Sequence, residues 1–269
     1  MLQDKIIPET ISYSALSDWS LCPQYYYLSN VLRLRPYKNT PDTFFGTLIH
    51  RYVQGILKGE LEAEKSCKEF ERKWGKLCRL FKLEEKWLPR TESARNIFTN
   101  ILPAFQQQFG NFKVLNIERK IAVKSGDKYP QLFKGYIDIV IELENGDRVI
   151  ADFKTADSSF FFMKYKDAVK DYQLSLYKWF YCSEENFDKK KMETYFVVLE
   201  KNPKSKKPIS IIRITSGDKK LDNATNWMNG ALSAINRGIH IRKKSSCYKF
   251  GQDHACMFCN SEHCPKSFG

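Results

Sequence analysis

Hydrophobic residues recur at two different spacings along this chain, and the change of spacing separates a helical part from a strand-rich part. Over residues 12–109 the apolar positions fall three and four apart, which is the period of a helix with one buried face. They predict helices over 12–30 and 43–57 and, with interruptions near Leu88-Pro89 and at Pro103, over 61–109. We expect residues 51–111 to form a helical insertion or arch.

From residue 113 onward the pattern changes to the alternation typical of strands. Apolar and polar residues alternate over 114–118 and 120–123, and two apolar runs, 133–143 and 148–154, flank an Asn145-Gly146 pair. An Asn-Gly pair between such runs is a strong signal for a β-hairpin. The later segments predict strands over 192–200 and 209–215 and helices over 167–181 and 221–237. Together they indicate an α/β fold in which helices flank a central mixed sheet.

Charge and composition narrow the class of partner. The chain has 269 residues and a net charge of +13, and a globular protein with this surplus usually meets a polyanion such as nucleic acid. A lysine-rich genome would raise the charge as well. The N-terminus lacks a signal-peptide pattern, and no apolar stretch reaches the ~18 residues that a membrane helix needs. We therefore expect an intracellular protein with no membrane association.

Charged residues interrupt both strands of the predicted hairpin. Asp138 lies within the apolar run of the first strand, and Asp152 and Lys154 are two residues apart on the second, hence on one face. A carboxylate in a buried strand is costly unless it is paired or bound to a metal, and oxygen ligands suit magnesium or manganese. Such a metal would activate water against a phosphate, with Lys154 stabilising the developing charge. The alternative is an ordinary hairpin with exposed charges.

Three further residues can join this constellation. Gln173 and Tyr177 are four apart on a predicted helix, so they share a face and can contact the phosphate or hold Lys154. His50 interrupts an apolar helix, and as a ligand it would favour manganese. A lone histidine of this kind more often belongs to the core or the surface.

The C-terminal tail carries a metal-binding spacing of cysteines. Cys256, Cys259 and Cys264 form a C-x2-C-x4-C run, and an intracellular protein is not expected to pair them as disulfides. The fourth ligand is open. Cys247 would complete a local zinc site, whereas Cys22 would favour an iron–sulfur site. His254 and His263 are further candidate ligands, and Cys67, Cys78 and Cys182 are expected to be packing residues.

Several short motifs occur in a fixed order along the chain. They are Ser12-Tyr13-Ser14, Cys22-Pro23 with Tyr25-Tyr26-Tyr27, Gly46-Thr47-Leu48-Ile49-His50, Gly135-Tyr136-Ile137-Asp138, Asp152-Phe153-Lys154 and Gln173-Leu174-Ser175-Leu176-Tyr177. Taken in order, they resemble RecB-like nucleases of the PD-(D/E)xK superfamily. The closing cysteines are similar to those of its iron–sulfur members, the CRISPR-associated RecB-like exonucleases and the AddB nuclease domain.

The resemblance implies a restriction-endonuclease-like core with a helical insertion and an iron–sulfur-bound tail. Two details differ from the family pattern. The last cysteine spacing is x4 where x5 is common, and Cys247 is a spare candidate ligand. The implied metal ligands are His50, Asp138, Asp152 and the Phe153 carbonyl. The implied catalytic residues are Asp138, Asp152, Lys154, Gln173 and Tyr177, and the implied 4Fe–4S ligands are Cys22, Cys256, Cys259 and Cys264. Glu118 matches an acidic position that some members have on the first core strand.

The function implied by the resemblance is a metal-dependent DNA exonuclease for single-stranded or frayed ends. It would act in the cytoplasm of a bacterial, archaeal or phage-infected cell, in repair or recombination, CRISPR adaptation or phage DNA processing, with protein partners there. We expect one nuclease domain over 1–269, with a core at 112–215 and a tail at 216–269 that packs on the first helix. The arch and the basic loop 201–207 would form a channel for a strand.

Three alternatives remain open at this stage. One is a structure-specific or RNA-directed nuclease of the same fold. Another is a nucleic-acid-binding partner subunit with secondary cleavage, and the third is a zinc-knuckle nucleic-acid-binding protein.

Overall fold

The computed structural model describes residues 6–35, 40–83, 88–164, 168–243, 257–259 and 262–264. The chain divides into two compact units, each built from separate segments of the sequence. The larger unit comprises Lys38–Lys120 and Tyr136–Leu221, and the smaller comprises Met1–Tyr37, Ile121–Gly135 and Asp222–Gly269. The expectation of one nuclease domain over 1–269 stays a prediction.

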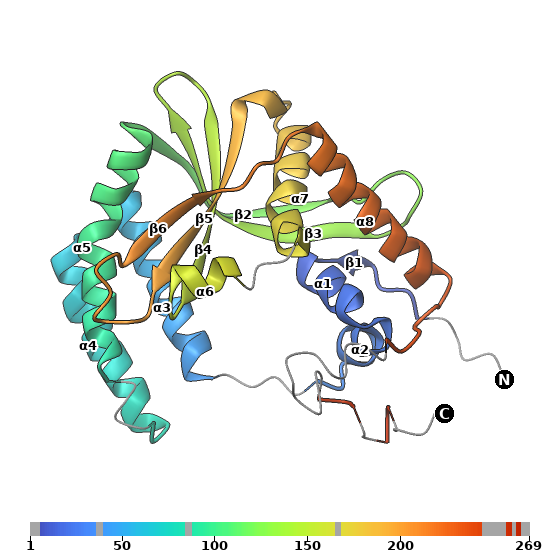
Figure 1. Ribbon diagram of the computed structural model, residues 1–269, viewed down its shortest axis with the longest axis horizontal. Helices are drawn as coiled ribbons and strands as arrows, with labels where there is room; N and C mark the ends of the chain where they lie inside the picture. The colour runs from blue at the N-terminus through green and yellow to red at the C-terminus, as the bar shows by residue number, and fades with distance from the viewer. Residues whose placement is uncertain are drawn as a thin grey trace. The chain divides into compact units, whose positions relative to one another are not determined.

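A mixed sheet forms the centre of the larger unit (Figure 1). Strand β3 (Leu132–Leu143) pairs antiparallel with β4 (Arg148–Ala156), β4 pairs parallel with β5 (Met192–Glu200), and β5 pairs antiparallel with β6 (Ile209–Arg213). This confirms the predicted α/β class with a mixed sheet. Strand β2 (Phe112–Lys124) pairs with β3 and is continuous where the sequence predicted two shorter stretches.

The predicted hairpin is formed by β3 and β4. Ile139 lies opposite Ala151 and Ile141 opposite Val149, which sets the register of the two strands. Gly146 closes the turn with a φ of +80°, and its amide donates to the Leu143 carbonyl at 2.9 Å. A left-handed φ of this kind is strain-free only for glycine, so the Asn-Gly pair fixes the turn and thereby the register.

Helices α3 (Pro41–Leu57) and α5 (Arg90–Phe109) cover one face of the sheet, and α4 (Ala63–Leu80) packs against both of them. Thr40 caps α3 in a capping box with Thr43. The buried faces of all three helices share one core with Val149, Ala151 and Phe153 of β4. The segment expected to form an arch is therefore helical, and it also supplies much of the main core of this unit, including Phe70, Trp74, Phe98 and Phe105.

The expected interruption at Pro103 is wrong, because α5 runs through this residue. A proline inside a helix removes one backbone hydrogen bond and costs about 3 kcal/mol. Ile101 and Phe105, on either side of Pro103, are completely buried. Burial of these two side chains outweighs the cost of the proline, since each buried side chain stabilises the fold by about 1.5–3 kcal/mol.

The opposite face of the sheet is covered by α6 (Ser159–Lys164) and α7 (Ala168–Glu184). Phe162 of α6 packs edge-on against Phe196 of β5, with ring centroids 5.5 Å apart. Successive residues of a strand point to opposite faces, so Asp152 and Lys154 lie on this face while Phe153 lies on the other. The short helix η3 (Lys189–Lys191) leads into β5.

The smaller unit contains β1 (Thr10–Ile11), α1 (Tyr13–Leu21), α2 (Pro23–Tyr26), the π-helix η1 (Tyr27–Val31) and most of α8 (Asp218–Asn236). The prediction of a single helix over 12–30 is wrong, since the first helix ends at Cys22, which is extended with φ −161° and ψ 117°. Pro23 explains the break, because a proline disfavours the helical region for the residue before it.

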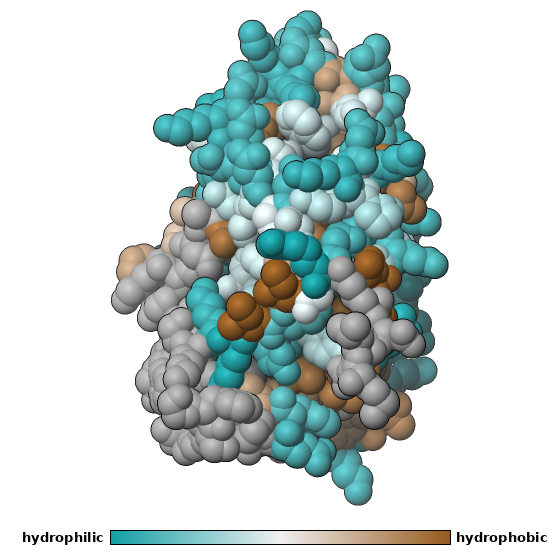
Figure 2. All heavy atoms as spheres, turned by 90° about the vertical axis from the view of Figure 1, so that its right-hand side faces the viewer, coloured by the Kyte–Doolittle hydropathy of each residue, from teal (hydrophilic) through white to brown (hydrophobic). Residues whose placement is uncertain are grey.

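Hydrophilic side chains predominate on the face of the molecule drawn in Figure 2, and the hydrophobic ones gather there only in small groups. None of the helices in the described ranges is both long enough and apolar enough to cross a membrane.

Candidate active site

The hairpin brings two of the predicted site residues together. Asp138 lies one position beyond the last paired residue of β3, next to Asp152 of β4. An oxygen of Asp138, Oδ2, accepts a hydrogen bond of 2.7 Å from the backbone amide of Phe153. Asp152 itself is only 2% exposed. Both carboxylates are therefore held in fixed positions in a largely dry environment.

Helix α7 supplies the side chain that joins Asp152 to Lys154. The amide nitrogen of Gln173 donates to Oδ1 of Asp152 at 2.9 Å, and its amide oxygen accepts from the Lys154 ammonium at 3.2 Å. The same ammonium lies 2.5 Å from Oδ2 of Asp152. Tyr177, one turn after Gln173, places its hydroxyl 3.4 Å from the Gln173 amide nitrogen.

His50 approaches the cluster from α3. Its Nδ1 lies 3.7 Å from Oδ2 of Asp138, and its ring meets the Phe153 ring edge-on at 5.7 Å. Phe153, whose carbonyl is an expected ligand, lies between Asp152 and Lys154 on β4 with its side chain in the core. The structure thus gathers the predicted site residues of the larger unit near the carboxylates, with Glu118 close enough to act electrostatically on Asp138.

Glu118 is connected to the cluster through Gln54, a residue that the sequence analysis missed. The Gln54 amide nitrogen donates to Oε1 of Glu118 at 2.7 Å and to the Asp138 carbonyl at 3.2 Å. Gln54 follows His50 by four residues, so the two share a helix face, and that spacing is the signal that could have found it. Glu118 has a φ of +48°, a strained conformation for a residue with a side chain.

Burial dominates the electrostatics of the cluster. It raises the pKa of Asp138 well above its usual value, and the neighbouring Asp152 carboxylate raises it further, while Lys154 opposes both. Burial also lowers the pKa of His50 to about 4, so the imidazole is neutral near pH 7 and keeps a lone pair for a ligand. The pKa of the Tyr177 hydroxyl is raised, mainly by burial.

The donor set suits a divalent cation, although the arrangement is not that of a complete metal site. In the described part of the chain, no three His, Cys, Asp or Glu side chains are arranged to hold a metal ion. Oδ2 of Asp152 is buried and makes no hydrogen bond of acceptable angle there, despite its short contact with Lys154. Two crowded carboxylates and a neutral imidazole are nonetheless ligands that magnesium or manganese accepts.

Two of the predicted cluster cysteines meet in the smaller unit. Cys22 and Cys264 are buried in one hydrophobic cluster with Phe258, and the backbone amide of Lys243 donates to the Cys22 sulfur at 3.3 Å. Cys259 is half-buried. Phe258 and Cys264 of the tail therefore pack in one cluster with Cys22, Tyr25 and Leu28. The expected packing of the whole tail on the first helix stays a prediction. Cys247, His254 and Cys256 lie outside the described residues.

Of the remaining candidates of this group, His263 borders that cluster. Its ring meets the Phe258 ring edge-on with centroids 6.3 Å apart, and its imidazole lies 3.4 Å from the Glu262 carboxylate. Cys67 and Cys78 pack in the larger core, and Cys182 is buried in α7, where burial raises its pKa to about 11. These last three positions fit the expected packing role.

Comparison with known proteins identifies the family. Residues 10–265 match the model of the PD-(D/E)XK nuclease superfamily. A crystal structure of a candidate exonuclease from Eubacterium rectale is similar in fold, with a TM-score of 0.52 and 15% identity over 90% of this chain and 87% of that one. A crystal structure named SSO0001 aligns with a TM-score of 0.32 and 14% identity over 87% and 78% of the two chains. No curated protein matches.

Proposed function

The chain belongs to the PD-(D/E)XK nuclease superfamily, and we propose that it is a metal-dependent deoxyribonuclease acting as an exonuclease on single-stranded or frayed DNA ends. One observation carries the proposal: Asp138, Asp152 and Lys154 converge on one face of the sheet, tied together by Gln173 and the Phe153 amide. An ordinary hairpin has no need of buried carboxylates held in this way. The net charge of +13 supports a polyanionic substrate.

Each side chain of the cluster has a role in phosphodiester hydrolysis. Lys154 can donate to a non-bridging phosphate oxygen or to the attacking water, which stabilises the charge that develops on phosphorus. Gln173 holds the ammonium and Asp152 in fixed relative positions, so less ordering is needed when the substrate arrives. Tyr177 supports the Gln173 amide through its hydroxyl.

Asp138, Asp152, His50 and the Phe153 carbonyl would hold the magnesium or manganese ion. Their fit rests on the chemistry of the donor set and on the burial and the neighbouring Asp152 carboxylate that raise the pKa of Asp138, because a cation would compensate the two adjacent negative charges. When bound, the ion polarises the scissile phosphate and lowers the pKa of a water molecule.

The test is a cleavage assay on DNA labelled at either end, single-stranded and double-stranded, with Mg²⁺, with Mn²⁺ and with a chelator. An exonuclease releases the terminal label as mononucleotides or short oligonucleotides before internal products appear, and only with metal. Internal cuts alone would reject the exonuclease assignment. Cleavage in the chelator would reject metal dependence, and cleavage of RNA alone would reject DNA as the substrate.

We also infer that the smaller unit holds a 4Fe–4S cluster through Cys22, Cys256, Cys259 and Cys264. The proximity of Cys22 and Cys264 and the amide hydrogen bond to the Cys22 sulfur support it, because backbone donors to the sulfurs are usual around such clusters. The cluster would join the first helical segment to the tail across most of the chain, which reduces the entropy of the unfolded state.

An absorbance spectrum and two cysteine variants test the cluster. Cys22→Ala should lose the broad iron–sulfur absorbance near about 400 nm, whereas Cys247→Ala and the control Cys182→Ala should keep it. A colourless protein that contains zinc, and loses it in Cys247→Ala, would replace the cluster with a local zinc site.

A further inference from the structure

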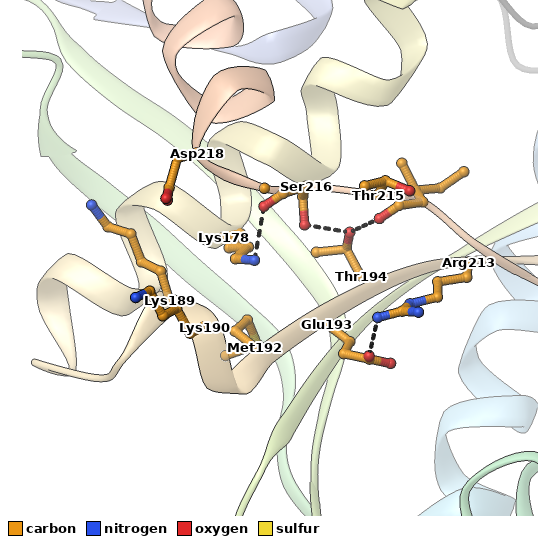
Figure 3. A pocket seen from close by; sticks show the side chains of 12 residues that line it. Lys178, Lys189, Lys190, Met192, Glu193, Thr194, Arg213, Thr215, Ser216 and Asp218 are labelled. Atoms are coloured by element: carbon orange, nitrogen blue, oxygen red, sulfur yellow. Dashed lines mark hydrogen bonds and ion pairs between the residues drawn. The ribbon is translucent and has the colours of Figure 1, made fainter.

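A cavity in the larger unit lies beside the start of β5 and is separate from the carboxylate cluster (Figure 3). It is bounded by residues of α7, η3, β5, β6 and the segment that leads into α8, and it includes none of the site residues named above. Its volume of about 290 Å³ exceeds the ~30 Å³ share of one water molecule several-fold. The cavity can therefore accommodate a group of several heavy atoms.

A buried lysine lines this cavity. Lys178 is only 6% exposed, and the hydrogen bond described for its ammonium goes to the Ser216 carbonyl at 2.8 Å. Within the described ranges no carboxylate lies at salt-bridge distance from it. An ammonium has three donors and is expensive to bury without an opposite charge. Burial accordingly lowers the pKa of Lys178. An anion in the cavity would compensate it.

The other charges around the cavity also favour an anion. Lys189 and Lys190 of η3 line it, and the Lys189 ammonium lies 3.5 Å from the centre of the Trp179 ring. Glu193 is engaged by Arg213 and by the Tyr195 hydroxyl. In Figure 3 this pair lies at one end of the cavity, and the three lysines lie at the other with Asp218. Three ammonium groups thus face one carboxylate.

Neutral groups complete the lining. The Thr194 hydroxyl donates to the Ile214 carbonyl at 2.7 Å and lies 3.0 Å from the Ser216 hydroxyl, so these polar side chains of the cavity are hydrogen-bonded to one another and to the backbone. Gly217 and Asp218 lie at the N-terminal end of α8, where the partial positive charge of a helix favours anions. A Cβ at Gly217 would meet nothing within 4 Å, so the backbone there is open to a ligand.

We propose that this cavity is a phosphate-binding site, built on Lys178, the η3 lysines and the end of α8, which holds a phosphate group of the nucleic-acid strand or of the released mononucleotide. Thr194 pairs with Ile150, two residues before Asp152 on the same face of β4, so the site lies on the face of the sheet that carries the proposed active site. Binding of phosphate in this cavity does not depend on the proposed nuclease function. The two sources named for the phosphate, a nucleic-acid strand and a released mononucleotide, rest on that function.

Equilibrium binding in the metal-free protein tests the proposal without cleavage. The ligands are inorganic phosphate, thymidine monophosphate and a single-stranded oligonucleotide. Lys178→Met removes the buried charge at nearly constant length, and Lys113→Met, at an exposed position of β2, is the matched control. Loss of a hydrogen bond between charged groups should weaken phosphate binding about tenfold or more. The control should bind as the wild type does.

The set of ligands that Lys178→Met binds more weakly identifies where the bound phosphate comes from. Weaker binding of the oligonucleotide as well as phosphate places a strand there, whereas weaker binding of phosphate and the mononucleotide alone places the product there. Unchanged binding of all three ligands in Lys178→Met would overturn the proposal. If that variant does not fold, the double variant Lys189→Gln/Lys190→Gln at the rim gives the same comparison. Lysine-dependent binding in a protein without nuclease activity would reject the proposed function and keep this site.

Discussion

Gln173 shows how one neutral side chain can organise charged neighbours. Its amide contacts both Asp152 and Lys154, which also form an ion pair with each other. Because an amide has both a donor and an acceptor, it can serve a carboxylate and an ammonium at the same time. Gln54 does similar work on the other side, between Glu118 and the backbone of Asp138.

Substitution of Asp138 tests its role as a metal ligand. Asp138→Asn keeps an oxygen that can accept from the Phe153 amide but removes the charge, so the fold should persist. We expect the Mn²⁺ concentration for half-maximal cleavage to rise at least tenfold, since neutral amides bind hard cations less well than carboxylates. Glu144→Gln, an exposed carboxylate in the hairpin turn, is the control. An unchanged manganese titration would argue against Asp138 as a ligand.

The histidine predicts a pH dependence of stability. The pKa of His50 is about 4 in the folded protein and 6.5 in the unfolded chain, so between these values the unfolded state binds the extra proton. Stability therefore falls as the pH drops from 6.5 to 4, by about 3 kcal/mol from this group.

Urea unfolding of the metal-free wild type and of His50→Gln across this range provides the measurement. The raised pKa of Asp138 acts in the opposite direction, which is why the comparison with the variant is needed. Equal slopes of the free energy of unfolding against pH in the two proteins would contradict a lowered pKa of His50 in the folded protein.

The site residues differ in how far the sequence could place them. Asp152 and Lys154 were predictable because strand alternation and the Asn-Gly turn fix their face and register. The spacing from His50 puts Gln54 on the same helix face, but its partners were not predictable, since a polar residue on a helix gives no sign of the distant strand that it contacts. Only the packing of α3 against the sheet brings it to Glu118 and the Asp138 carbonyl.

At the scale of the elements, two prolines in predicted helices had different effects on the helix that contains them. Pro103 does not end α5, because core burial on both sides stabilises the helix through it. Pro23 does end the first helix at Cys22. The difference lies in the packing around each proline, which the sequence pattern does not reveal. The sequence pattern also does not reveal that the buried faces of α4 and α5 belong to the main core of the larger unit.

The contribution of α4 to the core can be measured. Phe70 is 1% exposed and packs on Phe45, Trp74 and Phe98, so Phe70→Ala should reduce the free energy of unfolding by about 3–5 kcal/mol. Leu80, on the same helix but 73% exposed, is the control, and Leu80→Ala should change it by less than about 0.5 kcal/mol. A loss below about 1 kcal/mol for Phe70→Ala would show that α4 is peripheral.

At the scale of the whole molecule, net charge governs the encounter with nucleic acid. A surplus of +13 attracts phosphates and releases their counterions, so DNA affinity should fall steeply with salt. For single strands the slope of log affinity against log salt is about −0.7 for each phosphate contacted. Titrations at several salt concentrations in the metal-free protein give this slope. A flat dependence would contradict electrostatic binding of a polyanion.

The central claim is that the buried charges on β3 and β4 form the active site of a nuclease. The most direct measurement is the single-turnover rate of DNA cleavage with Mn²⁺, together with DNA affinity, for wild type, Lys154→Ala and the exposed control Lys113→Ala. We expect the rate to fall at least about a hundredfold in Lys154→Ala, with DNA affinity within about twofold of wild type and the control unaffected. Cleavage at the wild-type rate in Lys154→Ala would contradict the assignment of these residues to the active site.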